Sequence, residues 1–417
     1  MAHSQVGPNH AALAPQTPTP YHLAATAPMC YNPLTMADPS RDTSHIAINA
    51  HLLSGQSGYR SAGVHQYIYN LINHLGADGD DFRYSALVGS GELPHNPAVS
   101  QIRSGMDTEQ AFARILWEQL AQPAALREIK ADLVHGPVFV GPIVSPCPVV
   151  VTLHDLSFIR FPALFRRGNR LYLTVMTRLS AQRASRIIAV SAFTAKEAAA
   201  LLGVPRERID VVHNGVSPTF RPLATSEVEE YRRRGGLPER FILSVGTLEP
   251  RKNLVNLVQA FARIRDGDTV LVIAGGKGWF YEDVFAAVER LGLDDKVVFA
   301  GYIPQEELPL LYNAAEVFAY PSIYEGFGLP VVEAQSCGTP VICSNSSSLP
   351  EAAGDAAVMV DTRSVEALAD GLSQLITDAT LRRQLRQHGV KHASQFNWRR
   401  TAAQTSQVYR TALSERR

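Results

Sequence analysis

The chain has 417 residues, 46% of them hydrophobic, and its 39 basic residues equal its 39 acidic residues in number. This length and apolar content predict two packed domains, and the balanced charge gives no reason to expect nucleic acid as a partner. The cysteines at positions 30, 147, 337 and 343 form no CxxC pair. We interpret them as reduced thiols of a cytoplasmic protein.

Residues 1–44 differ in composition from the rest of the chain. They are rich in Ala, Pro, Thr and His, without periodicity. Such a segment buries too little apolar surface to offset its ordering entropy, so we expect a disordered N-terminal extension. No arginine precedes Arg41 and no clean apolar stretch is present, which disfavours a signal peptide. The alternative is that the native chain starts at Met36.

From residue 45 onward, short apolar runs alternate with amphipathic ones. We predict strands at 45–53, 84–89, 131–137, 148–158 and 186–193. Helices are predicted at 63–76 and 194–203, the second opened by Thr194 and closed by Gly203. The uncharged stretch 133–153 contains four prolines, each of which would cost about 3 kcal/mol inside a helix. We therefore expect two buried strands and a loop there instead of a membrane span.

The alternation restarts after a candidate linker at 217–226. We predict strands at 241–248, 269–276, 296–302, 317–322 and 340–345. Helices are expected at 253–264, capped by Asn253, and at 281–293, at 304–316, after Phe327 and at 399–417. Continuous apolar strands that alternate with helices indicate parallel sheets covered on both faces. The fold class is therefore α/β, with Rossmann-like doubly wound domains at 45–220 and 221–395 facing across a cleft, and a terminal helix in 396–417 crossing back.

The stretch "EGFGLPVVE", residues 325–333, begins and ends with a glutamate at a predicted strand-to-helix junction. Gly326 and Gly328 allow a ligand to approach the backbone, and Pro330 suits a first helical turn. The N–H groups at this helix start would face an anion. A diphosphate on these amides, a sugar hydroxyl on Glu325 and a ribose diol on Glu333 would account for the arrangement. The alternative is a capped helix with two surface glutamates.

"EGFGLPVVEAQSCGTPVICSNSSSLPE", together with "SVGTLEPRKNLVNLVQAF" upstream, resembles the retaining glycosyltransferases of family 4, which have the GT-B fold. The resemblance is strongest over residues 240–360. It implies a nucleotide-diphosphate sugar bound by the second domain and an acceptor bound by the first. It also implies a diphosphate held by the backbone of Gly326, Phe327, Gly328 and Leu329, without a metal.

The resemblance assigns further roles. Arg251 and Lys252 would clamp the departing diphosphate as charge accumulates on it. Basic residues at a helix start oppose its dipole, which favours a bound anion over ordinary helix-entry charge. Many family members carry one more basic residue where this chain has Thr247, so the clamp is weaker here. His154, at the end of a first-domain strand, would face the donor sugar; the alternative is a structural histidine.

Two weaker signals flank the cleft. Gly58, Ser61 and Gly63 form a glycine-rich turn after the first strand and would let the backbone come near the donor phosphate or the acceptor. Tyr302 and Ile303 follow a strand where family members hold the nucleobase, although plain loop packing explains them nearly as well.

Three patterns imitate other sites. "DGDD" at 78–81 resembles a metal-binding DxD but is expected in a turn between a helix and a strand. "AGGKGW" at 274–279 lacks P-loop spacing, and no complete GxGxxG occurs. We therefore expect no metal and no cofactor.

Residues 160–186 hold seven arginines and no acid, interleaved with aromatic and leucine side chains. Such a basic, partly apolar helix can lie on anionic lipid. A solvated basic face is the simpler interpretation.

These observations predict a retaining hexosyltransferase that moves a sugar, with mannose from GDP-mannose favoured, to a glycan or lipid-linked acceptor. We expect it in the cytoplasm, with peripheral contact at the inner face of the cell membrane. Two alternatives stay open: a sugar-nucleotide epimerase on the same fold, and a non-catalytic sugar-nucleotide-binding subunit. The sequence does not identify the acceptor.

Overall fold

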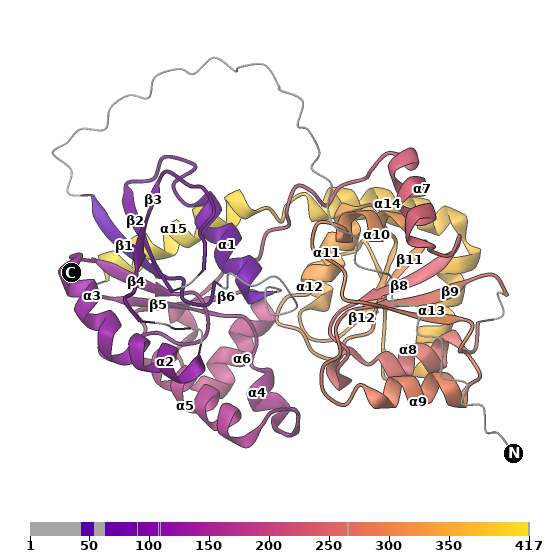
Figure 1. Ribbon diagram of the computed structural model, residues 1–417, viewed down its shortest axis with the longest axis horizontal. Helices are drawn as coiled ribbons and strands as arrows, with labels where there is room; N and C mark the ends of the chain where they lie inside the picture. The colour runs from indigo at the N-terminus through magenta and orange to yellow at the C-terminus, as the bar shows by residue number, and fades with distance from the viewer. Residues whose placement is uncertain are drawn as a thin grey trace, which may run out of the picture.

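A computed structural model describes residues 43–53, 63–89, 91–106, 108, 110–264 and 267–415. Its described part contains two parallel sheets that lie side by side (Figure 1). Most of the predicted 1–44 extension lies outside the described residues, as do the predicted turn residues Gly58 and Ser61.

The first sheet has seven strands in the order β3-β2-β1-β4-β5-β6-β7, and every neighbouring pair is parallel. Its strands are β1 (Ser44–Asn49), β2 (Phe82–Val88), β3 (Val99–Arg103), β4 (Leu133–Gly136), β5 (Val149–Leu153), β6 (Arg186–Ala189) and β7 (Ile209–Val211). The strand order reverses direction between β1 and β4, as in a doubly wound fold.

Helices cover both faces of the first sheet because its strand residues alternate between two cores. Ile46 and Ile48 face the core that holds α1 and the last helix, α15 (Trp398–Ser414), whereas Ala47 faces the core of α3, α4, α5 and α6. The helices are α1 (Val64–His74), α2 (Ala111–Leu116), a π-helical turn (Trp117–Ala121), α3 (Gln122–Glu128), α4 (Ser157–Arg160), α5 (Arg167–Arg183) and α6 (Ala192–Leu202).

The second sheet repeats the arrangement with six parallel strands in the order β10-β9-β8-β11-β12-β13. They are β8 (Phe241–Val245), β9 (Val270–Ala274), β10 (Val297–Gly301), β11 (Val317–Tyr320), β12 (Val341–Ser344) and β13 (Val358–Val360). The reversal falls between β8 and β11, so the loops after these two strands start from the point where such sheets bind ligands.

Two cores also flank the second sheet. The surrounding helices are α7 (Thr225–Gly235), α8 (Leu254–Phe261), α9 (Glu282–Arg290), α10 (Leu308–Ala314), α11 (Leu329–Ser336), α12 (Leu349–Ala353), α13 (Val365–Thr377) and α14 (Ala379–Ala393). The last helix, α15 (Trp398–Ser414), returns to the first sheet, where Trp398, Val408 and Tyr409 are buried in its core (Figure 1).

The predicted α/β fold class is confirmed, and several predicted bounds are wrong. Residues 157–160 are the short helix α4 and not the end of a strand, since Phe158 is buried from a helical turn. Helix α6 begins at Ala192 because Ser191, and not Thr194, caps it by accepting from the Thr194 N–H. Gly203 ends this helix with φ of 68°, as predicted.

Candidate active site

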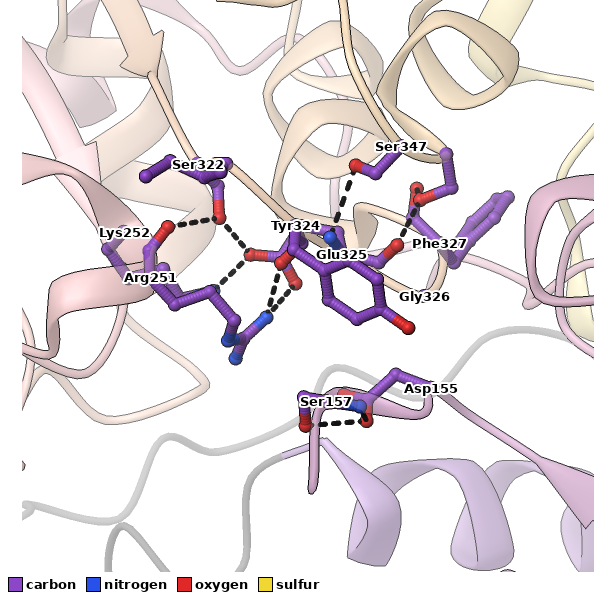
Figure 2. Close-up of polar contacts among 12 residues, drawn as sticks. Asp155, Ser157, Arg251, Lys252, Ser322, Tyr324, Glu325, Gly326, Phe327 and Ser347 are labelled. Atoms are coloured by element: carbon purple, nitrogen blue, oxygen red, sulfur yellow. Dashed lines mark hydrogen bonds and ion pairs between the residues drawn. The ribbon is translucent and has the colours of Figure 1, made fainter. Parts of the chain in front are cut away.

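The loops that follow β8 and β11 meet because these strands are neighbours in the second sheet. Arg251 Nη1 lies 2.8 Å from Glu325 Oε2, and Lys252 Nζ lies 2.6 Å from Glu325 Oε1. Figure 2 shows this carboxylate between the loops. The structure therefore brings together Arg251, Lys252 and Glu325, three of the four residues predicted to be catalytic.

Further hydrogen bonds hold this cluster. Ser322 Oγ and Tyr320 OH donate to Glu325 Oε1 at 2.6 and 2.9 Å. Glu249 Oε1 accepts from Arg251 Nη2 at 2.7 Å. Glu249 and Glu325 are only 7% and 8% exposed. The cluster thus pairs two cations with two buried carboxylates, so the cationic groups are held in fixed orientations.

Glu325 is ionised at any physiological pH. Burial alone would raise its pKa, but Arg251 and Lys252 outweigh that effect and lower the pKa to about 2. Burial lowers the pKa of Lys252, and Glu325 opposes this shift. Glu325 can therefore accept hydrogen bonds from sugar hydroxyls or stabilise a developing positive charge, and it cannot act as a proton donor.

The backbone after β8 differs from the expected helix start. Asn253 has φ of 56°, a left-handed conformation that separates a 3₁₀ turn at Pro250–Lys252 from helix α8. Asn253 is the N-cap residue of α8, as predicted, but its side chain forms no capping hydrogen bond, because Asn253 Nδ2 donates to Thr362 O at 2.7 Å. In this structure the side chain of Glu325 pairs with both cations, and Glu249 pairs with Arg251 as well.

The loop 326–328 connects Glu325 to α11. Among the described residues, no hydrogen bond is formed by the N–H groups of Gly326, Phe327 or Gly328. Gly328 has φ of 107°, which other residues rarely adopt. A Cβ on Gly326 would lie 1.6 Å from the carbonyl oxygen of His154, so only glycine fits at this position. The loop therefore offers unpaired amides and touches the N-terminal domain.

His154 lies at the carboxyl end of β5, opposite this loop. Its Nε2 lies 2.8 Å from Pro137 O, so Nε2 carries the proton and Nδ1 is an acceptor. Burial lowers the pKa of His154, which keeps the ring neutral. The rings of Tyr67 and Phe139 meet it at 4.7 and 5.8 Å between centroids. His154 is thus a fixed, uncharged group beside the loop.

Glu333 lies one turn into α11 in a different environment. It is 6% exposed, and its Oε2 accepts from Tyr312 OH at 3.0 Å. Burial raises its pKa to about 7, although the Tyr312 hydrogen bond acts in the opposite direction. No ion pair joins Glu333 to Arg251 or Lys252 among the described residues. The expected alternative of surface glutamates does not apply, since Glu325 and Glu333 are both buried.

The other predicted binding residues occupy separate positions. Tyr302 follows β10 and is 46% exposed, whereas the neighbouring Ile303 is 9% exposed and packs into a core of the second domain. Gly63 is the residue that precedes α1, with φ of 62° and open space around it. Leu329, the first residue of α11, is partly buried.

Comparisons with known proteins identify the family. A family model described as "Glycosyl transferases group 1" matches residues 227–392, and one described as "Glycosyltransferase Family 4" matches residues 61–220. The "O-antigen chain mannosyltransferase B" of Escherichia coli is 35% identical over 293 residues, which cover 69% of this chain and 77% of that protein. The chain belongs to glycosyltransferase family 4. As a member, it is a glycosyltransferase, a hexosyltransferase of a retaining family.

Solved structures show the same fold as this family 4 glycosyltransferase. Sucrose-phosphate synthase from Thermosynechococcus elongatus superposes with a TM-score of 0.72 at 24% identity, covering 89% of this chain and all (100%) of that one. Anabaena Alr3699/HepE, solved "in complex with UDP and glucose", gives a TM-score of 0.68 at 21% identity and covers 88% of this chain and 100% of that one. The GT-B architecture predicted from the sequence is therefore confirmed.

Several contacts of this glycosyltransferase escaped the sequence analysis. Ser191 and Thr194, at the start of α6 in the N-terminal domain, donate hydrogen bonds to the Gly326 carbonyl. Glu351 of α12 accepts a hydrogen bond from the Ala192 N–H at the start of the same helix, α6. Tyr324 OH accepts from the Leu156 N–H at 3.1 Å. Serine, threonine and tyrosine in these positions follow no distinctive motif, so only the position of Glu351 in the quoted "SSSLPE" gave any signal.

The remaining expectations concern metals and membranes. Across the described residues, no group of three or more His, Cys, Asp or Glu side chains is arranged to hold a metal ion. "DGDD" does lie between α1 and β2, where Asp78 pairs with Arg399 and Asp80 accepts from Ser406, both on α15. No described helix combines the length and apolar character that a membrane span requires.

Proposed function

We propose that the protein transfers a hexose, with retention, from a nucleotide-diphosphate sugar to a glycan or lipid-linked acceptor. The observation that carries this proposal is the convergence of Arg251, Lys252 and Glu325 beside the unpaired amides of residues 326–328. Positioned N–H groups and cations stabilise charge that develops on a departing diphosphate. They would do so here from two adjoining loops of one domain.

Within this proposal, Glu325 and His154 act on the hexose from opposite sides. Glu325 accepts a hydrogen bond from a sugar hydroxyl, and its charge favours the positive anomeric carbon of the transition state. His154, neutral and fixed by Pro137, offers Nδ1 to another hydroxyl. The acceptor attacks the face from which the diphosphate leaves, and the leaving phosphate oxygen takes the acceptor proton.

The nucleotide would extend along the second sheet. Glu333 holds the ribose diol, and the loop of Tyr302 and Ile303 lies beside the base. GDP-mannose is the proposed donor, because the similar Escherichia coli protein is described as a mannosyltransferase. Gly58, Ser61 and Gly63 are proposed to line the acceptor or phosphate side.

A screen of donors for slow hydrolysis tests this function. GDP-mannose, UDP-glucose, UDP-galactose and UDP-N-acetylglucosamine are each incubated with the full chain in excess EDTA, and products are identified by mass and chromatography. We expect GDP-mannose to yield GDP and mannose, and Arg251→Ala to lower the rate of this hydrolysis by about a hundredfold or more. Release of an epimeric sugar nucleotide would instead establish the epimerase. Tight binding without turnover of any donor, with or without added acceptor lysate, would establish the non-catalytic subunit.

We also propose that α5 contacts anionic lipid on the cytoplasmic face of a membrane. Leu171, Val175 and Leu179 recur at helical spacing along α5 and are 65%, 44% and 37% exposed. Arg166, Arg167, Arg178 and Arg183, on or next to α5, are exposed. An exposed apolar stripe with flanking arginines is typical of helices that lie at a lipid interface.

Two arginines of the segment do not belong to this surface. Arg160 pairs with Glu197, and Arg186 pairs with Asp210 at 2.8 Å, so both ion pairs stabilise the fold.

Co-sedimentation with phosphatidylglycerol vesicles tests the lipid contact. The fraction of protein recovered with the vesicles should be lower for Leu171→Ser/Val175→Ser than for the wild type. It should also fall with added salt, because charge attraction is screened within about 8 Å at physiological ionic strength. Equal recovery of both proteins with anionic and neutral vesicles would contradict the lipid contact.

A further inference from the structure

Two hydroxyls of the N-terminal domain hold the carbonyl of Gly326 in the C-terminal domain. Ser191 Oγ donates to Gly326 O at 2.5 Å, and Thr194 Oγ1 donates to it at 2.9 Å. Ser191 and Thr194 are 0% and 1% exposed and belong to the first turn of α6. The start of α6 therefore makes direct polar contact with the loop that carries the unpaired amides.

This contact fixes an amide as well as a carbonyl. In a planar trans peptide the C=O of one residue and the N–H of the next point in opposite directions. Because Gly326 O points at Ser191 and Thr194, the Phe327 N–H points away from α6. Buried hydroxyls on the carbonyl thus orient a backbone donor on the other side of the same peptide plane.

Glu351 holds α6 in place from the opposite domain. Its two carboxylate oxygens each accept from the Ala192 N–H at 2.9 Å, and Oε2 also accepts from the Phe193 N–H at 3.5 Å. His213 Nε2 lies 2.5 Å from Glu351 Oε1. A carboxylate at a helix N-terminus satisfies free N–H groups and is favoured by the helix dipole. Here that carboxylate comes from α12 of the C-terminal domain instead of from α6 itself.

The same loop also contacts His154, the residue that follows β5. The Gly326 Cα faces the His154 carbonyl closely enough to exclude any side chain. Two separate segments of the N-terminal domain, one after β5 and one after β6, therefore contact the same residue, Gly326, of the C-terminal domain.

We propose that Ser191 and Thr194 are positioning residues that set the Phe327 amide for the donor diphosphate, with Glu351 docking their helix between the domains. The proposal rests on the donor site described above. It makes affinity for the nucleotide diphosphate depend on side chains of the domain that does not bind the nucleotide.

Calorimetric titration of the full chain with GDP tests this dependence. Thr194→Val keeps the shape of the side chain and removes the donated hydrogen bond, and Glu351→Ala removes the docking carboxylate. We expect each to weaken GDP binding by about tenfold, the effect of one lost hydrogen bond to a positioned group. Thr194→Ser retains the hydroxyl and should bind as the wild type does. Ser191 is left unchanged because it also caps α6.

Asp378→Ala is the matched control for Glu351→Ala. Asp378 Oδ1 accepts from the Thr380 and Leu381 N–H groups, each at 2.9 Å, so it caps α14 wholly within the C-terminal domain. Asp378→Ala should lower the melting temperature and leave GDP affinity unchanged. Unchanged GDP affinity in Thr194→Val and Glu351→Ala would overturn the positioning role. Failure of the wild type to bind GDP or UDP would instead overturn the donor site on which the role rests.

Discussion

Glu325 and Glu333 stand eight positions apart, and the structure gives them opposite electrostatic environments. Glu325 lies between Arg251 and Lys252, which lower its pKa to about 2 despite its burial. Glu333 is equally buried, but its one hydrogen-bond donor among the described residues is the neutral Tyr312, and burial raises its pKa to about 7. Equal burial therefore leads to a permanent charge at one site and a titratable group at the other, because in the described part of the chain cations form ion pairs with Glu325 and not with Glu333.

This difference supports a division of labour. In the proposed mechanism, the permanent anion of Glu325 would lie next to the reacting carbon and stabilise charge that exists only in the transition state. The buried carboxyl of Glu333, proposed to lie on the nucleotide side, would bind the donor in ground and transition states alike.

Removal of a cation should have the largest effect. Arg251→Ala should lower turnover of the donor by about a hundredfold or more, as for loss of a positioned charge on a leaving group. Its melting temperature should also fall, since Glu249 and Glu325 lose a buried partner. Rates are therefore compared in the folded fraction. Arg240→Ala is the control, because Arg240 pairs with Glu316 outside the cluster, and turnover equal in the two variants would remove Arg251 from the mechanism.

The pH dependence of donor binding should follow Glu333. With a pKa of about 7, Glu333 gains its charge as pH rises from 6 to 8, and a carboxylate accepts from both ribose hydroxyls. The donor KM should therefore fall several-fold over this range, and Glu333→Gln should have a pH-independent, higher KM. A wild-type KM profile that survives unchanged in Glu333→Gln would assign the titration to another group.

The free energy of unfolding should fall as pH rises, whereas donor binding should tighten, and the change in unfolding free energy is the smaller effect. The folded pKa of Glu333, about 7, exceeds the ordinary 4.5, so the folded state holds more protons between these values and stability falls as pH rises through them. Each pKa unit corresponds to about 1.4 kcal/mol. Between pH 5 and pH 8 the wild type should therefore lose about 1–3 kcal/mol more unfolding free energy than Glu333→Gln does. Urea unfolding at the two pH values measures this. Glu366→Gln, an exposed acid of α13, should show no such difference from the wild type, and a similar difference there would refute the assignment.

The sequence was informative where a single segment carries the signal. Continuous apolar runs predicted ten of the strands, whereas the edge strand β3, "VSQIR", has mostly polar, exposed residues and was not predicted. Helix α6 was placed too late because Thr194 and Ser191 are equally good caps on paper. "EGFGLPVVE" indicated an anion site because its glycines, proline and acids adjoin one another.

Contacts between distant segments could not be derived in this way. Glu325 meets Arg251 because β8 and β11 become neighbours at the reversal of the sheet, and strand order is not written in local periodicity. The hydrogen bonds that Ser191, Thr194 and Glu351 form between the domains depend on how the two domains pack. From the sequence, Arg251 and Lys252 were predicted to bind the anion of a ligand. Their ion pairs with the Glu325 carboxylate were not predicted.

The most direct test of this account is the kinetic contrast between Glu325→Gln and Glu333→Gln with the donor that the screen identifies. Both substitutions keep shape and remove charge, so the two variants differ mainly in which environment is changed. We predict that Glu325→Gln lowers kcat with little change in donor KM, and that Glu333→Gln raises donor KM with little change in kcat. Equal losses in both variants that follow the melting temperature, with unchanged kinetics in the folded fraction, would contradict it.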